Sequence, residues 1–319
     1  MSVDMTAQET SPKLATAHDY VELMKPRIMM LVVFTALAGL VAAVGVTGQS
    51  INPILATIAI LSVALGSGAA GAINMWYDAD IDAIMTRTST RPIPSGAIPK
   101  DEALTMGLIM SAASVLLMWI ASNVLAAGLL ALSIAYYGWF YTMVLKRRTA
   151  QNIVIGGAAG AFPPVIGWAA VTGSTPLDAW ILFAIIFFWT PPHFWALSLV
   201  AHKEYEKAGV PMLPVTSGAK ATRLQILLYS IVLAPIGLAP LATGLGGIVY
   251  GIIGALLTAA FLYFAVKVWL SRAGDADAGD PERKLAMRMF AFSILYLFGL
   301  FAALIIEHGF GLHFGIGGI

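Results

Sequence analysis

The sequence predicts an all-α, polytopic membrane protein, and three observations support this prediction. Of the 319 residues, 59% are hydrophobic and only 11% are charged, with a mean hydropathy of +0.84. A soluble globular chain has about a quarter of its residues charged. Nine apolar stretches approach the roughly 20 residues that a helix needs to cross a bilayer. Lys and Arg residues recur at every second connection between these stretches.

The nine predicted spans follow one another through mostly short connections. Glycine and proline occur inside several of them, which membrane helices tolerate because neighbouring groups satisfy the freed backbone atoms. The spans cover roughly residues 28–47, 53–75, 103–121, 123–143, 153–171, 177–200, 224–243, 246–270 and 286–306.

The distribution of positive charge predicts the orientation. All 18 Lys and Arg residues lie in the N-terminal segment or near the connections after the second, fourth, sixth and eighth spans. Because cytoplasmic loops carry the excess of Lys and Arg, we expect a cytoplasmic N-terminus, and nine spans then place the C-terminus outside. The expected organisation is a cytoplasmic tail over residues 1–24, one transmembrane domain over 25–306 and a short periplasmic tail over 307–319. Chemistry that needs charged groups is therefore expected at the cytoplasmic side.

The most informative polar cluster follows the second span, within residues 74–95. Asn74, Asp78 and Asp82 are four residues apart, which places them on one helix face within about 80° of arc. Such oxygen-bearing side chains suit a hard cation such as Mg²⁺, which binds one or two carboxylates and shares its shell with phosphate oxygens. Asp80 points elsewhere and is expected to be solvated. The alternative is a solvated helix end without a site.

Cations near this cluster favour an anionic ligand. Arg87 and Arg91 follow it, and guanidinium groups bind phosphate through paired hydrogen bonds. Lys146 begins a run of three cations at the end of the fourth span, close to Tyr141, although such runs are usually topology anchors. The absence of cysteine excludes a thiolate metal site and a cysteine nucleophile.

A second polar cluster ends the sixth span on the same side. Glu204 is the candidate carboxylate that would complete a metal and diphosphate site, with Lys203 as a phosphate partner. The alternative is that these residues merely surround a loop. The charged stretch 271–285 resembles an ordinary solvated loop and receives no site.

Histidine offers a separate candidate site. His193 lies in the apolar sixth span beside two prolines, where a lone histidine is usually hydrogen-bonded structure. Ionisable groups inside a membrane are nevertheless candidates for function, and an imidazole is a suitable ligand for a metalloporphyrin. His308 and His313 lie on the outer side, where a structural role is expected.

These residues resemble a known family. The run Asn-x-x-x-Asp-x-x-x-Asp with its trailing Arg-Thr-Ser-Thr-Arg-Pro is similar to the first aspartate-rich motif of intramembrane aromatic prenyltransferases, the UbiA superfamily. The segments GGAAGAFPPVIGW, TPPHFW and AGVPMLP resemble those of the branch of that superfamily that farnesylates haem. The resemblance covers about residues 20–306. The chain departs from the superfamily at the second motif, where Lys203, Glu204 and Glu206 stand in place of two or more aspartates.

The resemblance implies a bundle of nine helices around a central cavity in the cytoplasmic membrane. It implies transfer of a farnesyl group from farnesyl diphosphate to a vinyl group of haem B, with addition of water, giving haem O for the terminal oxidase. Mg²⁺ is the implied cofactor and haem B is a substrate. The expected partners are the lipid bilayer and haem A synthase or assembly proteins of the oxidase; nucleic acid is not expected.

Three sets of residues are carried onto this sequence. The metal set is Asn74, Asp78, Asp82 and Glu204, and these residues with Lys146 form the catalytic set. The diphosphate set is Arg27, Arg87, Arg91, Lys146 and Lys203. The acceptor set is Tyr141, His193 and Trp195.

Two rival functions remain at this point. A quinone or chlorophyll prenyltransferase would have the same metal site and a different acceptor. A secondary transporter also carries carboxylates in its helices, but it places ionisable groups near the middle of the membrane and opens to both sides of it. The gathering of charged residues on the cytoplasmic side favours the enzyme.

Overall fold

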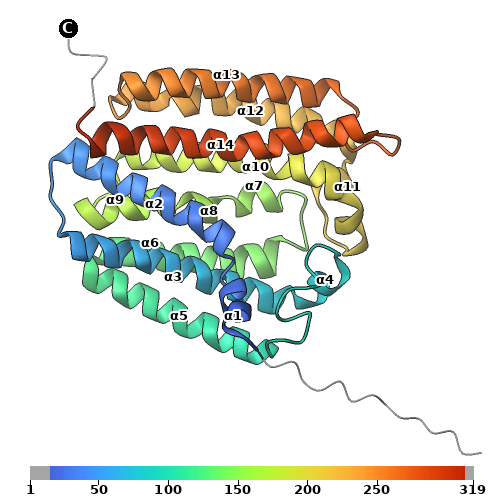
Figure 1. Ribbon diagram of the computed structural model, residues 1–319, viewed down its shortest axis with the longest axis horizontal. Helices are drawn as coiled ribbons and strands as arrows, with labels where there is room; N and C mark the ends of the chain where they lie inside the picture. The colour runs from blue at the N-terminus through green and yellow to red at the C-terminus, as the bar shows by residue number, and fades with distance from the viewer. Residues whose placement is uncertain (1–14, 313–319) are drawn as a thin grey trace, which may run out of the picture.

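The computed structural model describes residues 15–312, and over this range the protein is a bundle of helices without a β-strand (Figure 1). The predicted structural role of His313 lies outside the described residues. The same holds for residues 1–14 and 313–319 of the two predicted tails.

Nine segments of the described chain are long and apolar enough to cross a membrane, as predicted. They are α2 (Pro26–Thr47), α3 (Pro53–Tyr77), α5 (Lys100–Ala121), α6 with η1 (Val124–Ala135 and Tyr136–Leu145), α7 to α9 (Asn152–Gly156, Ala158–Ala161 and Pro163–Thr172), α10 (Leu177–Lys207), α12 (Gly218–Thr243), α13 (Ile248–Leu270) and α14 (Asp280–Gly309). Three short helices complete the described chain: α1 (Ala17–Leu23), α4 (Ala79–Ile84) and α11 (Leu213–Thr216).

Several spans extend further than predicted at their charged ends. α10 continues to Lys207 instead of ending near residue 200, and α14 begins at Asp280 instead of near residue 286. Hydropathy marks only the part of a helix that suits lipid, whereas the backbone hydrogen bonds continue into the polar sequence beyond it. Glu204 consequently lies on a helix rather than in a loop.

Local sequence explains where several spans begin and end. The side chain of Asn52 accepts a hydrogen bond from Ile54 N at the start of α3, and that of Asn123 accepts one from Ala126 N at the start of α6. α2 ends at Gly48, whose φ of 66° is a left-handed conformation that glycine adopts without steric cost. These caps keep the connections between spans short.

The fourth span changes its helix type halfway. After α6 ends at Ala135, the chain continues as the π-helix η1, a rare arrangement that is often found at functional sites. Thr142 Oγ1 donates to the carbonyl of Tyr137, five residues earlier, at 2.7 Å, and Lys146 N donates to the carbonyl of Tyr141 at 2.9 Å. This wider turn sets the directions of Thr142 and Lys146.

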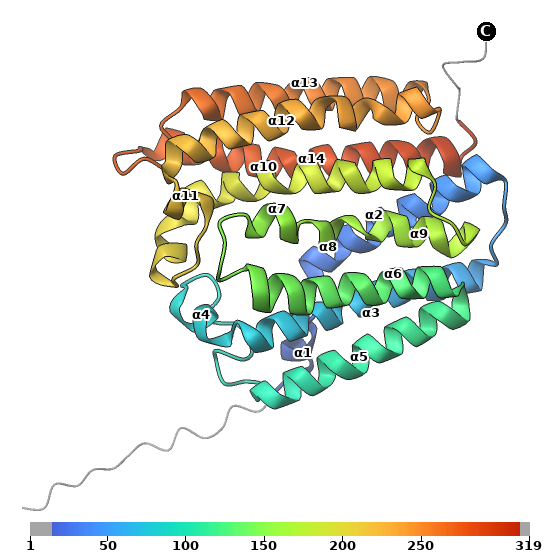
Figure 2. The ribbon, with the colours of Figure 1, turned by 180° about the vertical axis from the view of Figure 1, so that it is seen from behind.

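The spans lie side by side, and the connections gather at two opposite ends of the bundle. α4, α11 and the α13–α14 connection lie at one end, whereas the α2–α3 connection lies at the other (Figure 1). The broken fifth span, α7 to α9, lies between α6 and α10 when the protein is seen from behind (Figure 2). The predicted polar clusters therefore share one end.

α2 and α9 approach each other backbone to backbone. A Cβ on Gly39 would lie 2.1 Å from the carbonyl oxygen of Pro164, and a Cβ on Gly167 would lie 2.0 Å from that of Ala36. Helices pack this closely in membranes where small residues form the interface. The crossing fixes the first span against the fifth.

A cavity of about 710 Å³ lies inside the bundle, which confirms the predicted central cavity. Its wall is formed by α2, α3, the fourth and fifth spans, α10 and α14, and is mostly apolar. A separate hollow of about 980 Å³ lies between α3, α5 and the fourth span and contains none of the predicted site residues. Its rim includes Leu108, Trp119 and Trp139, each more than half exposed, so this hollow belongs to the lipid-facing surface.

Candidate active site

Asn74, Asp78 and Asp82 are buried together at the end of the second span. Asp78 caps α3, and α4 continues almost without a break, since Asp78 N donates to Asn74 O at 2.9 Å and Asp82 N donates to Asp78 O at 2.8 Å. The three residues are 3%, 0% and 2% exposed. The structure thus brings the three predicted residues together on one stretch of helix, withdrawn from solvent.

Asp78 is held through one of its two carboxylate oxygens. Oδ2 accepts hydrogen bonds from Asn74 Nδ2 at 2.8 Å and from Lys146 Nζ at 2.5 Å. Among the described residues no hydrogen-bond donor reaches Oδ1, and Arg147 Nη2 lies 3.6 Å from it. Asp78 therefore keeps one buried oxygen with free lone pairs.

Asp82 is paired with the loop that follows it. Arg91 Nη1 lies 2.6 Å from Asp82 Oδ2, and Thr88 Oγ1 donates to the carbonyl of Asp82 at 2.9 Å. Arg91 is therefore at the cluster, as its place in the predicted diphosphate set requires. A buried carboxylate needs such a partner, because an isolated charge in a low-dielectric interior is strongly unfavourable.

Lys25 is a member of the cluster that sequence reasoning did not select. Its Nζ donates to Asn74 Oδ1 and lies 5.7 Å from the centroid of the Tyr137 ring. Burial, reinforced by the nearby cations of Arg91 and Lys146, lowers the pKa of Lys25 to about 7.

The backbone conformation of Lys25 explains how its side chain reaches the cluster. Among the described residues it is the only non-glycine residue with a positive φ, 53°, a conformation that costs about 1–3 kcal/mol. It precedes Pro26, the first residue of α2. The Lys-Pro step at the start of a span is visible in the sequence, but the strained turn that points the lysine at Asn74 is not.

The fourth span supplies two further polar groups. Thr142 Oγ1 accepts from Asn74 Nδ2 at 3.0 Å, while Lys146 reaches Asp78 as described. Thr142 was not predicted, because a threonine in an apolar span has no distinguishing pattern. The π-helical turn places both side chains on the cluster.

Arg147 forms a neighbouring pair on the surface. Asp80 has a side chain that is 61% exposed, as expected, but it is bound by Arg147 through two hydrogen bonds of 2.6 and 2.7 Å. The hydrogen bonds from Arg147 lower the pKa of Asp80, and the same contact raises the pKa of Arg147. Asp80 is thus solvated without being free.

The second polar cluster lies beside the first. Ile81 and Met85 of the α4 region pack in one apolar group with Tyr205, near the end of the sixth span, and with Val210 and Met212, which follow that span. The two predicted motifs are therefore neighbours in space.

The candidate ligands of the second cluster differ in placement. Glu204 is half-buried, and its Oε2 is buried without a hydrogen-bond partner among the described residues. Arg87 lies beside Tyr205 at an exposed position. Lys203 is exposed and forms no ion pair with the described residues, so the structure does not bring it to Asp78 or Asp82.

The oxygen groups at this end are of the kind that a hard divalent cation prefers, although among the described residues Asp78, Asp82 and Glu204 do not form a group whose ligand atoms all lie within 4.8 Å of one another. Asp78 Oδ1 and Glu204 Oε2 are buried and lack hydrogen-bond donors, and Asn74 and Asp82 add an amide and a third carboxylate. Such all-oxygen sets match the ligand preference of Mg²⁺. The surrounding cations Lys25, Lys146 and Arg91 would accompany an anion bound beside the metal.

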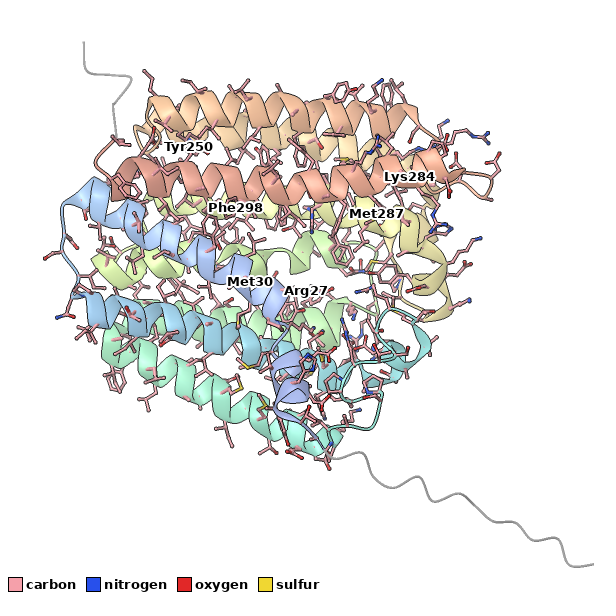
Figure 3. All side chains as sticks on the ribbon, viewed as in Figure 1. Arg27, Met30, Tyr250, Lys284, Met287 and Phe298 are labelled. Carbon is pink, nitrogen blue, oxygen red and sulfur yellow. The ribbon has the colours of Figure 1, made fainter. Side chains whose placement is uncertain are left out.

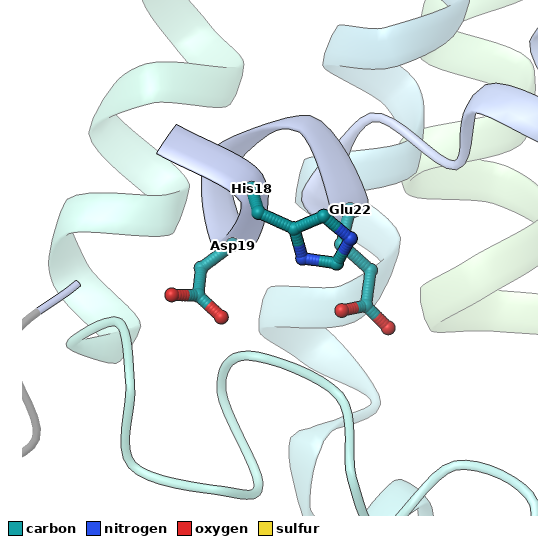
Figure 4. Close-up of side chains that lie close together, drawn as sticks. All are labelled: His18, Asp19 and Glu22. Carbon is teal, nitrogen blue, oxygen red and sulfur yellow. The ribbon is translucent and has the colours of Figure 1, made fainter. Parts of the chain in front are cut away.

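A different acidic group lies on α1. His18, Asp19 and Glu22 have possible ligand atoms within 4.8 Å of one another (Figure 4). Asp19 Oδ2, however, accepts hydrogen bonds from Thr16 N at 2.8 Å and from Thr16 Oγ1 at 2.7 Å in a capping box. The start of a short helix therefore accounts for the carboxylate.

The cavity adjoins the polar cluster through Lys25, Tyr137 and Tyr141, which line its wall. Asp78 and Asp82 are not part of that wall. Tyr141 lies flat against α7, since a Cβ on Gly156 would come within 2.1 Å of its ring. Arg27 also lines the cavity and is exposed; Figure 3 shows it at the start of α2.

Of the predicted acceptor residues, His193 and Tyr141 line the cavity, but Trp195 does not. Trp195 is 1% exposed and packs edge-on against Tyr229 of α12, with ring centroids 5.3 Å apart. Two residues along a helix turn the side chain by roughly 200°, so Trp195 faces away when His193 faces the cavity. The expectation that both contact the acceptor is wrong for Trp195.

Comparisons with known proteins agree with this architecture. The sequence profile of the UbiA prenyltransferase family matches residues 32–294. Protoheme IX farnesyltransferase of Hyphomonas neptunium is 71% identical over 315 residues, which cover 99% of each chain.

Solved structures of other chains share the fold at low sequence identity. A digeranylgeranylglyceryl phosphate synthase has a TM-score of 0.71 at 18% identity, covering 91% of this chain and 98% of that one. A UbiA homolog from Archaeoglobus fulgidus bound to DMAPP and Mg²⁺ has a TM-score of 0.67 at 18% identity, covering 90% and 99%. The fold, the profile and the full-length identity lead to one conclusion: the chain is an integral membrane protein that belongs to the UbiA prenyltransferase family.

Proposed function

We propose that this protein transfers the farnesyl group of farnesyl diphosphate to a vinyl group of haem B, with addition of water. The observation that carries the proposal is the 71% identity, over 99% of both chains, to a protein named protoheme IX farnesyltransferase. In the present protein the cavity adjoins a cluster of buried carboxylates and cations, as a bulky apolar donor with a charged leaving group requires. A quinone or chlorophyll precursor as acceptor has no such support.

The polar cluster would receive the diphosphate. Asn74, Asp78, Asp82 and Glu204 would hold Mg²⁺, and the bound ion would neutralise negative charge on the leaving group. Lys146 and Arg91 already lie at the carboxylates and would contact the phosphate oxygens, with Arg87 and Arg27 near the mouth. Lys203 retains its predicted role only if its exposed side chain turns inward.

The reaction balances without a side-chain nucleophile. The C–O bond between farnesyl C1 and the diphosphate breaks, and the electron pair leaves with the diphosphate. A vinyl carbon of haem B forms the new C–C bond, and water adds to the neighbouring carbon with loss of one proton. Cations positioned where charge develops on the leaving group stabilise the transition state electrostatically. The apolar wall keeps water from the farnesyl group before it reacts.

The acceptor would lie in the cavity beside His193. The imidazole is stacked between Trp189 and Phe290, at centroid distances of 4.2 and 4.5 Å, and all three residues line the cavity. An imidazole is a common axial ligand of haem iron. Tyr141 lies on the wall nearer the polar cluster, where the reacting vinyl group would be.

We place the active site at the cytoplasmic face of the inner membrane, with the N-terminus in the cytoplasm and the C-terminus in the periplasm. The alternating distribution of Lys and Arg supports this orientation. Haem A synthase or an assembly protein of the terminal oxidase would receive the product.

The decisive experiment is incubation of the purified protein with haem B, farnesyl diphosphate and Mg²⁺, with products read by mass spectrometry. We expect a haem carrying one farnesyl and one hydroxyl group, with the hydroxyl oxygen labelled when isotopically labelled water is used. A parallel incubation with 4-hydroxybenzoate as acceptor serves as the comparison. Prenylation of that acceptor, with unchanged haem, would contradict the proposal.

A further inference from the structure

His193 is held in place by a hydrogen bond to α14 as well as by its two stacking partners. Its Nδ1 lies 2.6 Å from Ser293 Oγ on α14, a residue one hundred positions away and 0% exposed. The two ring faces are covered by Trp189 and Phe290, at interplanar angles of 17° and 22°. The ring is therefore held at one edge and covered on both faces.

The hydrogen bonds around Ser293 determine which nitrogen carries the proton. Ser293 Oγ also lies 2.6 Å from the carbonyl oxygen of Phe290, which only accepts hydrogen bonds. The single hydroxyl proton of Ser293 is therefore donated to Phe290, and Oγ accepts from His193 Nδ1–H. The neutral imidazole is thus the Nδ1–H tautomer, with an unshared electron pair on Nε2.

Nε2 is the atom left available on this ring. No side chain among the described residues donates a hydrogen bond to it, and it is absent from the buried atoms that lack a partner. The backbone of Phe290 is a further hydrogen-bond partner of the ring. His193 lines the cavity, whereas Ser293 lies behind it and does not. A histidine that binds a metal through one nitrogen almost always donates the other N–H to a fixed acceptor.

We infer that Ser293 is a positioning residue that holds His193 as the Nδ1–H tautomer and presents Nε2 to the iron of the haem acceptor. The inference rests on the proposed function, since it assumes that haem B enters this cavity. Ser293 itself does not touch the haem. Its backbone carbonyl also accepts from Trp189 Nε1 at 2.7 Å, so one residue holds both the edge of the imidazole and the indole that covers it.

The test is a double-mutant cycle on haem binding, which needs no turnover. Ser293→Ala removes the side-chain acceptor but keeps the carbonyl that binds Trp189. We expect haem B to bind about 10- to 100-fold more weakly, as for other residues that orient a metal ligand. In the ferrous complex, the iron–histidine stretching frequency in resonance Raman spectra should fall, because Nδ1 loses its hydrogen bond. His193→Ala should abolish that band, and adding Ser293→Ala to it should cause no further loss of affinity.

Matched controls exist in the same chain. Ser230 is 1% exposed and donates to the carbonyl of Ile226 at 2.6 Å, so Ser230→Ala removes a similarly buried serine that is not part of the cavity wall. His202 lies on α10 and contacts the carbonyl of Leu199, so His202→Ala removes a histidine outside the cavity wall. Both variants should bind haem as the unmodified protein does.

Two outcomes would overturn the inference. One is an unchanged iron–histidine band and affinity in Ser293→Ala. The other is a loss of affinity that is as large in the His193→Ala background as in the unmodified protein, which would mean that Ser293 acts through packing. Failure of the unmodified protein to bind or farnesylate haem is a separate result that refutes the proposed function itself.

Discussion

Asn74 and Asp78 are joined by a hydrogen bond across one helical turn, from Nδ2 to Oδ2 at 2.8 Å. With Lys146 on the same oxygen, this bond fixes the carboxylate so that Oδ1 is the free oxygen. The amide oxygen of Asn74 faces Lys25 instead. The direction of the amide therefore decides which oxygens at this end of the bundle are open to a ligand.

Asp78→Ala and Asp82→Ala are each expected to reduce farnesyl transfer by at least about 100-fold, because each removes a buried carboxylate from the predicted metal set. Asp80→Ala is the matched control, since Asp80 lies between them in sequence but is exposed and bound to Arg147. Transfer is measured by mass spectrometry of the haem product, and the folded state by gel filtration in detergent.

Removal of divalent cations is the second arm of this test. EDTA should stop turnover, and added Mg²⁺ should restore it in the unmodified protein and in Asp80→Ala. Undiminished activity in EDTA, or in both Asp78→Ala and Asp82→Ala, would rule out the metal and diphosphate site.

Lys146→Met should destabilise the protein by about 1–3 kcal/mol, because it removes the nearest cation from the buried carboxylate of Asp78 and leaves only Arg147, 3.6 Å from Oδ1, as a charged partner. Asp78 is 0% exposed, and the side chain of Lys146 is 14% exposed. The double variant Lys146→Met with Asp78→Asn removes both charges and should recover most of this stability while remaining inactive. Thermal unfolding in detergent, followed by tryptophan fluorescence, provides the measurement. If the double variant is as unstable as Lys146→Met, the pair does not carry the predicted energy.

Gly167→Ala should destabilise the bundle by about 1–3 kcal/mol through overpacking at the α2–α9 crossing. The added Cβ would meet the carbonyl oxygen of Ala36 at 2.0 Å, and backbone atoms have little room to move. Gly128→Ala is the control, because a Cβ there meets nothing within 4 Å and alanine is the better helix former. The same thermal unfolding assay compares the two, and equal midpoints would contradict the close crossing.

The orientation is testable because the chain has no cysteine. Ser89→Cys and Ser217→Cys, on the loop after α4 and before α12, should react with an impermeant maleimide only from the cytoplasmic side. Ser174→Cys, in the connection between α9 and α10, should react only from outside. Labelling of Ser89→Cys from outside in intact cells would refute the orientation and the cytoplasmic active site together.

Length and hydropathy were sufficient to predict the nine spans, since a bilayer imposes one requirement on every helix. Length and hydropathy cannot reveal the π-helix of the fourth span or the breaks in the fifth span, because both leave the apolar composition unchanged. The extension of α10 to Lys207 was also missed, since a helix continues past the lipid wherever its hydrogen bonds do.

The candidate site was predictable where its members share one helix and less so where tertiary contacts assemble it. The spacing of Asn74, Asp78 and Asp82 is a property of a single helix. Lys25 reaches Asn74 from the turn before α2 and Thr142 reaches it from the fourth span, and no local pattern marks either contact. The wrong placement of Trp195 has a helical cause, because residues two apart never share a face.

The ion pairs Lys146–Asp78 and Arg91–Asp82 link the proposed metal-binding carboxylates to the proposed diphosphate-binding cations. While a cation lies on a carboxylate, that carboxylate is less open to a metal and that cation is less open to a phosphate. A metal ion taking the carboxylates releases the cations, and a phosphate taking the cations releases the carboxylates. By thermodynamic reciprocity, each ligand must then raise the affinity of the other by the same factor. The polar cluster beside the cavity would then bind the metal ion and the diphosphate together more strongly than either alone. An allylic diphosphate that arrives without the metal ion would be bound weakly.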